Sequence, residues 1–246
     1  MDSTMAYPKK PAVLPRKPGK VRRPRRPRSA TPLTRARIVA TALALVDREG
    51  LQGLSMRRLG AELGVDPMAV YHHLPNKDAL LDALVEAVMG EIDLSRDDPA
   101  ESPEERVLCA ARAYREVMLA HANALPIVLA RGPATPVALR PVELLVGVLR
   151  AAGLPPEQAL AGMNAIAAAV RGEVGMAAHH AGRGTPARTA EARAADFPAA
   201  QFPFLHEAIL CAGEASERDF EFGIRALARG LIAAGGNPES VRNGQA

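Results

Sequence analysis

The chain of 246 residues is poor in aromatic side chains and in cysteine. It contains no tryptophan, three tyrosines, five phenylalanines and two cysteines, Cys109 and Cys211, with no CxxC pair. Two distant cysteines offer neither a disulfide framework nor a zinc cluster, and they suit a reducing cytoplasm. No apolar run approaches the roughly 18 residues that span a bilayer, and no hydrophobic segment follows the basic N-terminus as a secretory signal requires. We therefore expect a cytoplasmic protein without a membrane partner.

Motifs that carry catalytic chemistry are also missing. There is no HExxH, no Gly-rich phosphate loop beside a strand and no Ser-His-Asp motif. Adjacent histidines occur at 72–73 and 179–180, but neighbouring positions on a helix point apart and chelate one metal ion poorly. We expect no enzyme, no cofactor and no metal site.

What the chain does have is an uneven distribution of charge. The formal net charge is +4, but residues 1–32 hold ten basic residues and one acid, which puts +9 on this segment and −5 on the rest. The segment contains seven of the 21 prolines and the run RRPRRPR at 22–28. It can bury too little apolar surface to offset its chain entropy, so we predict a disordered basic arm over 1–32. Such an arm is either a solubilising leader or a segment that follows a nucleic-acid backbone or minor groove.

Residues 33–93 predict four helices, each with its own start signal. Thr34, Ser55, Asp66 and Asn76 are the expected N-caps, and Pro67 takes the first helical position after Asp66. Glycines at 50 and 64 end the first two helices. Two short helices joined by a tight glycine turn form a helix-turn-helix, whose second helix projects outward and can enter a major groove.

From residue 94 onward the chain is rich in alanine and predicts further helices. We expect them over 103–121, 125–130, 136–152, 156–181, 202–212 and 216–234, with a loop over 182–198. No alternation typical of strands occurs, so the predicted fold class is all-α. It comprises a three-helix helix-turn-helix domain over 33–93 and a helical domain over 94–246.

Three features of residues 34–93 carry a resemblance: LSMRRLGAELGV at 54–65, Tyr71 in the short helix that follows, and Asn76-Lys77 before a leucine-rich helix. The segment resembles the DNA-binding domain of the TetR family of transcriptional repressors, and the later helices resemble the ligand-binding and dimerisation domain of its tetracycline-repressor branch. The resemblance implies a sequence-specific regulator, a repressor released from its operator by a small-molecule effector. It also implies a homodimer, paired through helices 156–181 and 216–234, on a pseudo-palindromic operator of double-stranded DNA.

The resemblance assigns DNA contacts to Thr34, Ser55, Arg57, Met68, Ala69, Tyr71, His72, His73 and Lys77. Arg57 reaches either a guanine edge, which its forked guanidinium fits, or a phosphate. Met68, Ala69 and His72 are the implied base readers, and the first two suit thymine methyl groups. The others are implied backbone contacts or helix caps whose hydroxyls also touch phosphate. The tetracycline repressor has proline where Met68 stands, so no operator sequence carries over.

Effector contacts are implied for Tyr114, Met118, His121, Met163, Asn164 and Glu173, which lie on helices that resemble the family's pocket walls. Two methionines among small alanines suit an adaptable apolar pocket. Two functions of other classes stay open. One is a non-specific architectural DNA-binding protein that uses the arm, and the other is an enzyme that uses the helical cavity.

The basic arm leads to a prediction, because residues 34–80 hold six basic residues and five acids and are nearly neutral. If the arm supplies the non-specific attraction, deletion of residues 1–30 should weaken DNA binding and flatten the slope of log K against log salt, since fewer counterions are released. Fluorescence anisotropy with one duplex at several salt concentrations measures both quantities. An unchanged slope would contradict the role given to the arm.

Overall fold

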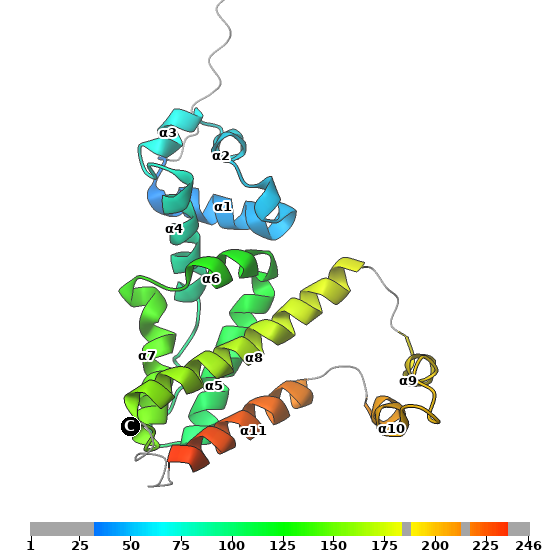
Figure 1. Cartoon of the computed structure of the whole chain (residues 1–246). Coiled ribbons are helices and arrows are strands. Elements are labelled where there is room, and N and C mark those ends of the chain that lie inside the picture. Colours follow the sequence, from blue (N-terminus) through cyan, green and yellow to red (C-terminus); the bar gives the residue numbers. More distant parts are fainter. Residues whose placement is uncertain (1–31, 184–187, 213–216, 236–246) are drawn as a thin grey trace, which may run out of the picture.

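The computed structural model describes residues 32–183, 188–212 and 217–235. Every regular element within these ranges is a helix, so the predicted all-α fold class is confirmed. The prediction of a disordered arm falls almost wholly on residues 1–31, outside the described ranges. Figure 1 shows two parts: a small head, from α1 to the start of α4, and a body made of the longer helices.

The head consists of α1 (Arg35–Glu49), a 3-10 turn η1 (Leu51–Gly53), α2 (Met56–Leu63), α3 (Pro67–Tyr71) and the first turns of α4 (Lys77–Gly90). All four predicted N-caps are confirmed, because each side chain accepts a hydrogen bond from a backbone N–H of the first turn. The donor–acceptor distances are 2.7 Å at Asn76 and 3.1 Å at Ser55. Caps are local interactions, so they define where each helix begins without help from the rest of the fold.

The turn between α2 and α3 depends on two glycines. Gly64 has φ 71° and ψ 24°, the left-handed conformation that a side chain disfavours. Gly60 is buried inside α2, where a Cβ atom would stand 3.2 Å from backbone atoms of Pro67 and Val65. The missing side chain at Gly60 therefore allows the start of α3 to lie close against α2.

The body contains α5 (Pro103–Ala120), η2 (Ala122–Ala124), α6 (Leu125–Arg131), α7 (Pro136–Ala151), α8 (Pro156–Arg183) and α11 (Glu217–Gly235). The helices predicted for these segments are confirmed, with ends that differ by one or two residues. α5 packs against α7, α8 and α11, and Gly162 of α8 lies between Leu149 of α7 and Leu231 of α11. None of the described helices is both long and apolar enough to cross a membrane.

The predicted loop over 182–198 is wrong in part. α8 continues to Arg183, and residues 190–194 form a short helix, α9 (Ala190–Ala194), which Thr189 caps. Alanine and glutamate continue the helix easily after the cap, and an ion pair of 2.5 Å between Arg188 and Asp196 spans it. α9 packs against α10 (Pro203–Cys211), and Figure 1 shows this pair beyond the ends of α8 and α11.

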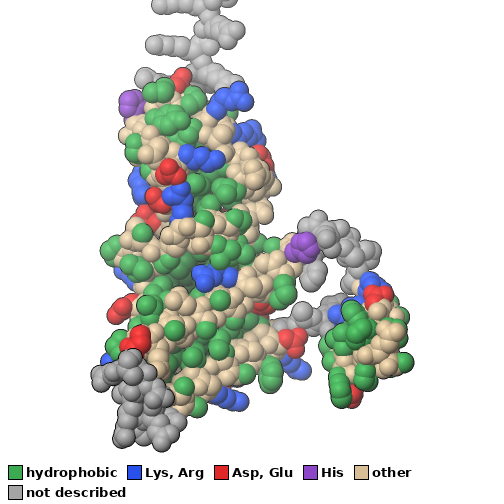
Figure 2. Space-filling model, in the orientation of Figure 1, with side chains coloured by type: hydrophobic (Ala, Val, Ile, Leu, Met, Phe, Trp, Pro, Cys, Tyr) green, Lys and Arg blue, Asp and Glu red, His purple; other side chains and the backbone are tan. Residues whose placement is uncertain are grey.

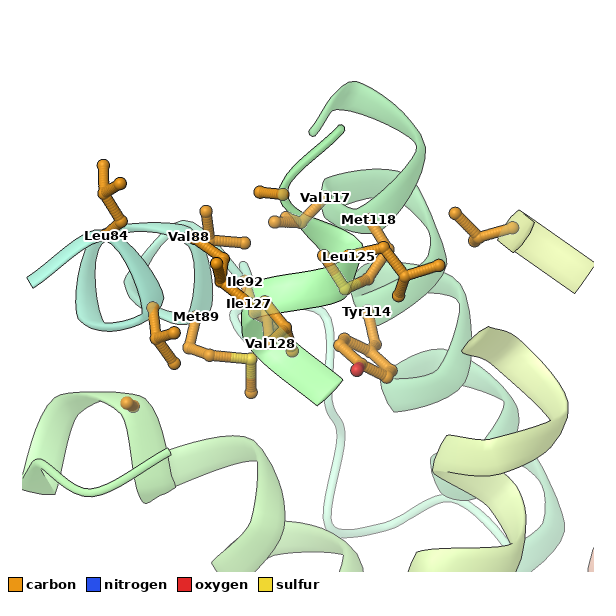
Figure 3. Packing of buried hydrophobic residues seen from close by; sticks show 14 of the residues in the cluster. Leu84, Val88, Met89, Ile92, Tyr114, Val117, Met118, Leu125, Ile127 and Val128 are labelled. Atoms are coloured by element: carbon orange, nitrogen blue, oxygen red, sulfur yellow. The ribbon is translucent and has the colours of Figure 1, made fainter. Parts of the chain in front are cut away.

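One continuous apolar core joins the head to the body. It extends from Leu45 and Leu59 in the head, through Leu84 and Met89 of α4, to Leu108 of α5. Figure 3 shows the side chains of α4 beside those of α5 and α6. The last turns of α4 are thus part of the body, while its first turns are part of the head.

The close approach at Gly60 yields a prediction about stability. Replacement of Gly60 by alanine should destabilise the protein by about 1–3 kcal/mol, because the new methyl group meets backbone that cannot rotate away. Gly147 of α7 is the matched control, since a Cβ atom there meets nothing within 4 Å. Gly147→Ala should stabilise the protein by about 0.5–1 kcal/mol through helix propensity alone. Urea unfolding measures both free energies, and equal effects of the two substitutions would refute the packing role of Gly60.

Candidate functional site

The helix α3 has a side packed in the head and a side exposed to solvent. Val70 and Leu74 are buried in the head, whereas Met68 is 62% exposed and Tyr71 38% exposed. Asp66 caps the helix by accepting a hydrogen bond of 2.8 Å from the Met68 backbone N–H, which orients the first turn. A five-residue helix held in this way presents one large apolar and one phenolic side chain to solvent.

The other predicted contacts on and just after α3 differ in exposure and in backbone conformation. Ala69 of α3 is only half-exposed. His72 follows the helix as its C-cap, and His73 lies in the next turn. Backbone bonds from both His73 and Leu74 to the Val70 carbonyl tighten the chain here, which ends α3 at Tyr71. Both histidines remain exposed.

Two arginines lie at the start of α2, and they differ in whether they form ion pairs. Arg58 pairs with Glu49 at 2.7 Å and with Glu62 at 3.7 Å, and its hydrogen bond to Glu49 holds the pKa of that carboxyl below its ordinary value. The neighbouring Arg57 is exposed and makes no ion pair within the described residues. Arg57 is therefore able to meet an external acceptor, while Arg58 is occupied within the head.

The other predicted contacts of the head lie at helix starts. Thr34 and Ser55 are exposed caps of α1 and α2, and each accepts a hydrogen bond of 3.1 Å from a backbone N–H. Lys77 is exposed at the first position of α4, where free backbone N–H groups also favour an anion. All nine residues belong to the head, which lies at the opposite end of the molecule from α11 (Figure 1). Figure 2 shows basic and acidic side chains interspersed on this part of the molecule.

A histidine clasp holds the head to the body. The His121 ring contacts Asp47 of α1 through Nδ1 at 2.9 Å and Glu91, just after α4, through Nε2 at 2.8 Å. Asn123 adds a hydrogen bond of 2.8 Å from its side-chain amide to the Asp47 carbonyl. Burial disfavours the charged ring, but the hydrogen bonds to Glu91 and Asp47 outweigh it, so the pKa of His121 lies above its ordinary value. His121 thus connects elements of both parts of the molecule.

Arg131 forms a second clasp at the end of α6. Its guanidinium pairs with Asp82 of α4 at 2.6 Å and also with Asp78, one turn earlier. These contacts attach the N-terminal half of α4 to the body, while the His121 clasp holds the region where α4 ends. Movement of α4 therefore changes both sets of ion pairs.

An apolar cavity of about 60 Å³ lies in the body, between α4, α5, α6, α7 and α8. Tyr114 and Met163, two of the six predicted effector contacts, line it. Met89 of α4 and Val128 of α6 line it as well, and Figure 3 shows Met89, Val128 and Tyr114 close to one another. The cavity thus touches the helix that continues into the head.

The other four predicted effector residues do not line this cavity. Met118 is fully buried in the core one turn after Tyr114, and His121 belongs to the clasp with α1. Asn164 of α8 is exposed and does not line the cavity. Glu173 makes a bidentate pair with Arg115 at 2.7 and 2.8 Å, which ties α5 to α8.

Sequence reasoning missed Met89 and Arg171, which both line the cavity. A signal for Arg171 exists in the spacing of Met163, Ala167 and Arg171, which stand four residues apart and so share one face of a helix. No comparable signal exists for Met89, because its contact with the cavity arises only when α4 packs on the body. A larger hollow of about 750 Å³ follows the outer side of α5, but its lining is mostly charged, for example Glu105 and Arg112.

Two family profiles match the chain and together cover the head and the body. The profile "Tetracyclin repressor-like, C-terminal domain" matches residues 97–234, and the profile "Bacterial regulatory proteins, tetR family" matches residues 38–84. The chain belongs to the TetR family. It is therefore a DNA-binding transcriptional regulator, and the alternative of a non-specific architectural protein is not favoured.

Individual relatives agree with this membership. The chain is 33% identical over 213 residues to an HTH-type transcriptional regulator of Saccharopolyspora erythraea, which covers 83% of this chain and 86% of the relative. It is 37% identical over 106 residues to the tetracycline repressor class C of Escherichia coli, which covers 42% of this chain and 48% of the relative. Its fold is similar to that of Streptomyces coelicolor ActR in complex with actinorhodin, with a TM-score of 0.71 and 32% identity over 84% of this chain and 100% of that chain.

The His121 clasp predicts a pH-dependent contribution to stability. Because the folded-state pKa lies above the ordinary value of 6.5, protonated His121 stabilises the fold fully below that pH and the contribution is lost as pH rises through the folded pKa. His121→Gln should therefore lower the free energy of unfolding by about 1 kcal/mol near pH 6 and by little near pH 9. The loss is no larger because Glu91 is half-exposed and solvent screens its charge. Urea unfolding of both proteins across this range gives the difference.

Asn123→Ala is the control for this titration, because it removes a neighbouring bond to Asp47 without removing a titrating group. Its effect on the free energy of unfolding should not change with pH. If the cost of His121→Gln is the same at both ends of the range, the charged clasp is ruled out.

Proposed function

We propose that this TetR-family member is a repressor that binds a two-fold pseudo-palindromic operator as a homodimer and leaves it when a small apolar effector enters the body cavity. The observation that carries the proposal is that α4 links two surfaces. Its start adjoins α3, which exposes Met68 and Tyr71, and its end contributes Met89 to the cavity. An effector that changes the cavity can therefore change the position of α3.

On the DNA side, the proposed roles follow from the chemistry of the exposed residues. Met68 and Ala69 provide apolar contact for thymine methyl groups, while Arg57 offers a fork that matches guanine O6 and N7. Tyr71 donates its hydroxyl hydrogen to a phosphate oxygen, and Lys77 supplies a positive charge there. His72 reads a base edge, and His73, Thr34 and Ser55 contact the backbone.

The proposed dimer interface uses small residues on the exposed sides of two long helices. On α8 these are Ala161, Ala165, Ala168 and Gly172, and on α11 they are Ala226, Gly230 and Ala233. Exposed small residues at spacings of three or four form a smooth face against which a second helix packs closely. Members of the family act as dimers, and this face fits that assembly.

The proposed release depends on the small size of the cavity. A volume of about 60 Å³ is below the 300–1,000 Å³ or so that ligand pockets usually have, so an effector must widen it. Widening displaces Met89 and with it α4. The protein then has two conformations, one with a wide cavity that fits the effector and one with a narrow cavity that fits the operator. The effector must bind the widened state more tightly by at least the free energy that operator binding loses.

The cavity is proposed to bind its effector without transforming it. Its lining within the described residues offers only Tyr114 and Arg171 as polar side chains, and no described carboxylate or histidine pairs with either of them as a base would. Because the chromosome of a bacterium lies in the cytoplasm, we place the regulator there.

The proposal is tested by selecting bound sequences from random DNA with the purified full chain. The expected product is a palindrome whose half-sites are about 10–10.5 base pairs apart, or a multiple of this, because a two-fold dimer presents α3 to successive major grooves. A selection that enriches no site, or only a single half-site, would reject the proposed mode of binding.

Arg57→Ala then tests the head on the selected operator. If Arg57 reads guanine, its loss should weaken binding about tenfold or more and relax the preference at one position of each half-site. If it meets phosphate, binding should weaken equally on all sequences and the salt slope should decrease. Arg140→Ala, an exposed arginine of α7, is the matched control and should change neither. Unaltered affinity and preference in Arg57→Ala would remove Arg57 from the interface.

A further inference from the structure

The polar side of the cavity consists of two residues that face each other from different helices. Apart from Tyr114 of α5 and Arg171 of α8, every residue that lines the cavity is apolar. Both side chains line the same cavity, and Arg171 is near enough to affect the pKa of the Tyr114 hydroxyl. Burial, opposed by Arg171, raises the pKa of Tyr114 above its ordinary value, so this phenol stays neutral and cannot balance the charge of the arginine.

Arg171 lacks the counter-charge that other arginines of the body have. Arg106 pairs with Asp97 at 2.8 Å, and Arg115 pairs with Glu173 at 2.7 Å. Arg171 makes no ion pair within the described residues, and its Nε atom is buried without a hydrogen-bond partner. A guanidinium that is partly removed from water without a carboxylate is unfavourable, and an anion brought to it would relieve this.

The position of Arg171 on α8 directs this charge to the cavity. Met163, Ala167 and Arg171 follow one another at intervals of four residues and all line the cavity, so they form one stripe along the helix. The flexible side chain of Met163 is at one end of the stripe and the charge is at the other. The cavity thus has an apolar, adaptable part and a cationic end.

We propose that the effector is an apolar organic anion. Its single acidic group, such as a carboxylate, pairs with the Arg171 guanidinium and accepts a hydrogen bond from the Tyr114 hydroxyl. Its rings or chain lie between Met89 and Met163. This inference rests on the proposed function, since it names the class of molecule that enters the same cavity.

A matched pair of dyes tests the proposal without knowledge of the natural effector. Anilinonaphthalene sulfonate and phenylnaphthylamine share the same rings and brighten in apolar surroundings, but only the first carries an acidic group. The wild-type chain should bind the sulfonate at least about tenfold more tightly than the neutral dye, because a charge-assisted hydrogen bond favours it. Fluorescence titration gives both dissociation constants.

Four variants assign this preference to the cavity. Arg171→Gln should weaken binding of the sulfonate about tenfold and leave the neutral dye unchanged. Arg140→Gln removes the same charge from the exposed surface of α7 and should affect neither dye. Ala167→Trp fills the cavity and should abolish saturable binding of both. Thermal unfolding checks that each variant folds, and Arg171→Lys, which keeps the charge, should retain a preference for the sulfonate.

The outcomes separate this inference from the proposed function. If Ala167→Trp abolishes both dyes but the wild type shows no preference for the sulfonate, or Arg171→Gln acts no differently from Arg140→Gln, the anionic class is wrong and the cavity stands. If Ala167→Trp leaves binding of both dyes intact, the effector site itself is wrongly placed. A wild-type chain that binds neither dye also overturns the inference.

Discussion

The fold depends on α4 being one helix that belongs to two packed regions. Leu80 and Leu84 are completely buried, as is Val88, one turn nearer to the body, and Met89 follows at the cavity. Protein interiors are packed as densely as organic crystals, so a helix embedded at both ends cannot move at one of them alone. The unbroken helical hydrogen bonding between Lys77 and Gly90 makes the connection stiff. Head and body are for this reason mechanically coupled.

The clasps around α4 set its orientation more than they hold the parts together. Arg131 pairs with aspartates that are largely exposed, and Glu91 is half-exposed in the His121 clasp. Exposed ion pairs contribute only about 0–1 kcal/mol each, far less than the burial of the leucines of α4. Their value lies in geometry: they are made or broken by small shifts of the helix. The apolar core supplies cohesion, and the ion pairs select among nearby positions.

The parts of the fold that the sequence predicts well are those encoded by neighbours in the chain. Ser55 and Asn76 could be assigned as caps because a cap acts on N–H groups two or three residues away. The sequence predicts a loop where the helix at 190–194 lies, because so short a helix has no apolar periodicity to reveal it. The long helices were predictable since their apolar faces repeat many times.

The candidate site shows the same difference between residues predictable from local pattern and residues placed by tertiary contacts. Tyr114 and Met163, which the resemblance assigns to the effector pocket, line the cavity, whereas His121 contacts Asp47, a residue 74 positions earlier in the chain. Such a pairing cannot be inferred from local pattern. Met89 was missed for the same reason, because only the docking of α4 on the body brings it to the cavity. Tertiary contacts between distant segments account for the difference between prediction and structure.

The position of the cavity determines which of its walls can move. α8 contributes Arg171 to the cavity and exposes Ala168 and Gly172 on the face proposed for the dimer, so a partner packed on that face would also hold this wall. α4 contributes Met89 to another wall, and within the described residues it is held by its own core contacts and by exposed ion pairs. A ligand anchored on α8 therefore exerts its effect on Met89 and α4. In the proposed dimer, a displacement of α4 in each copy changes the separation of the two α3 helices. The fit to an operator with fixed half-site spacing depends on that separation.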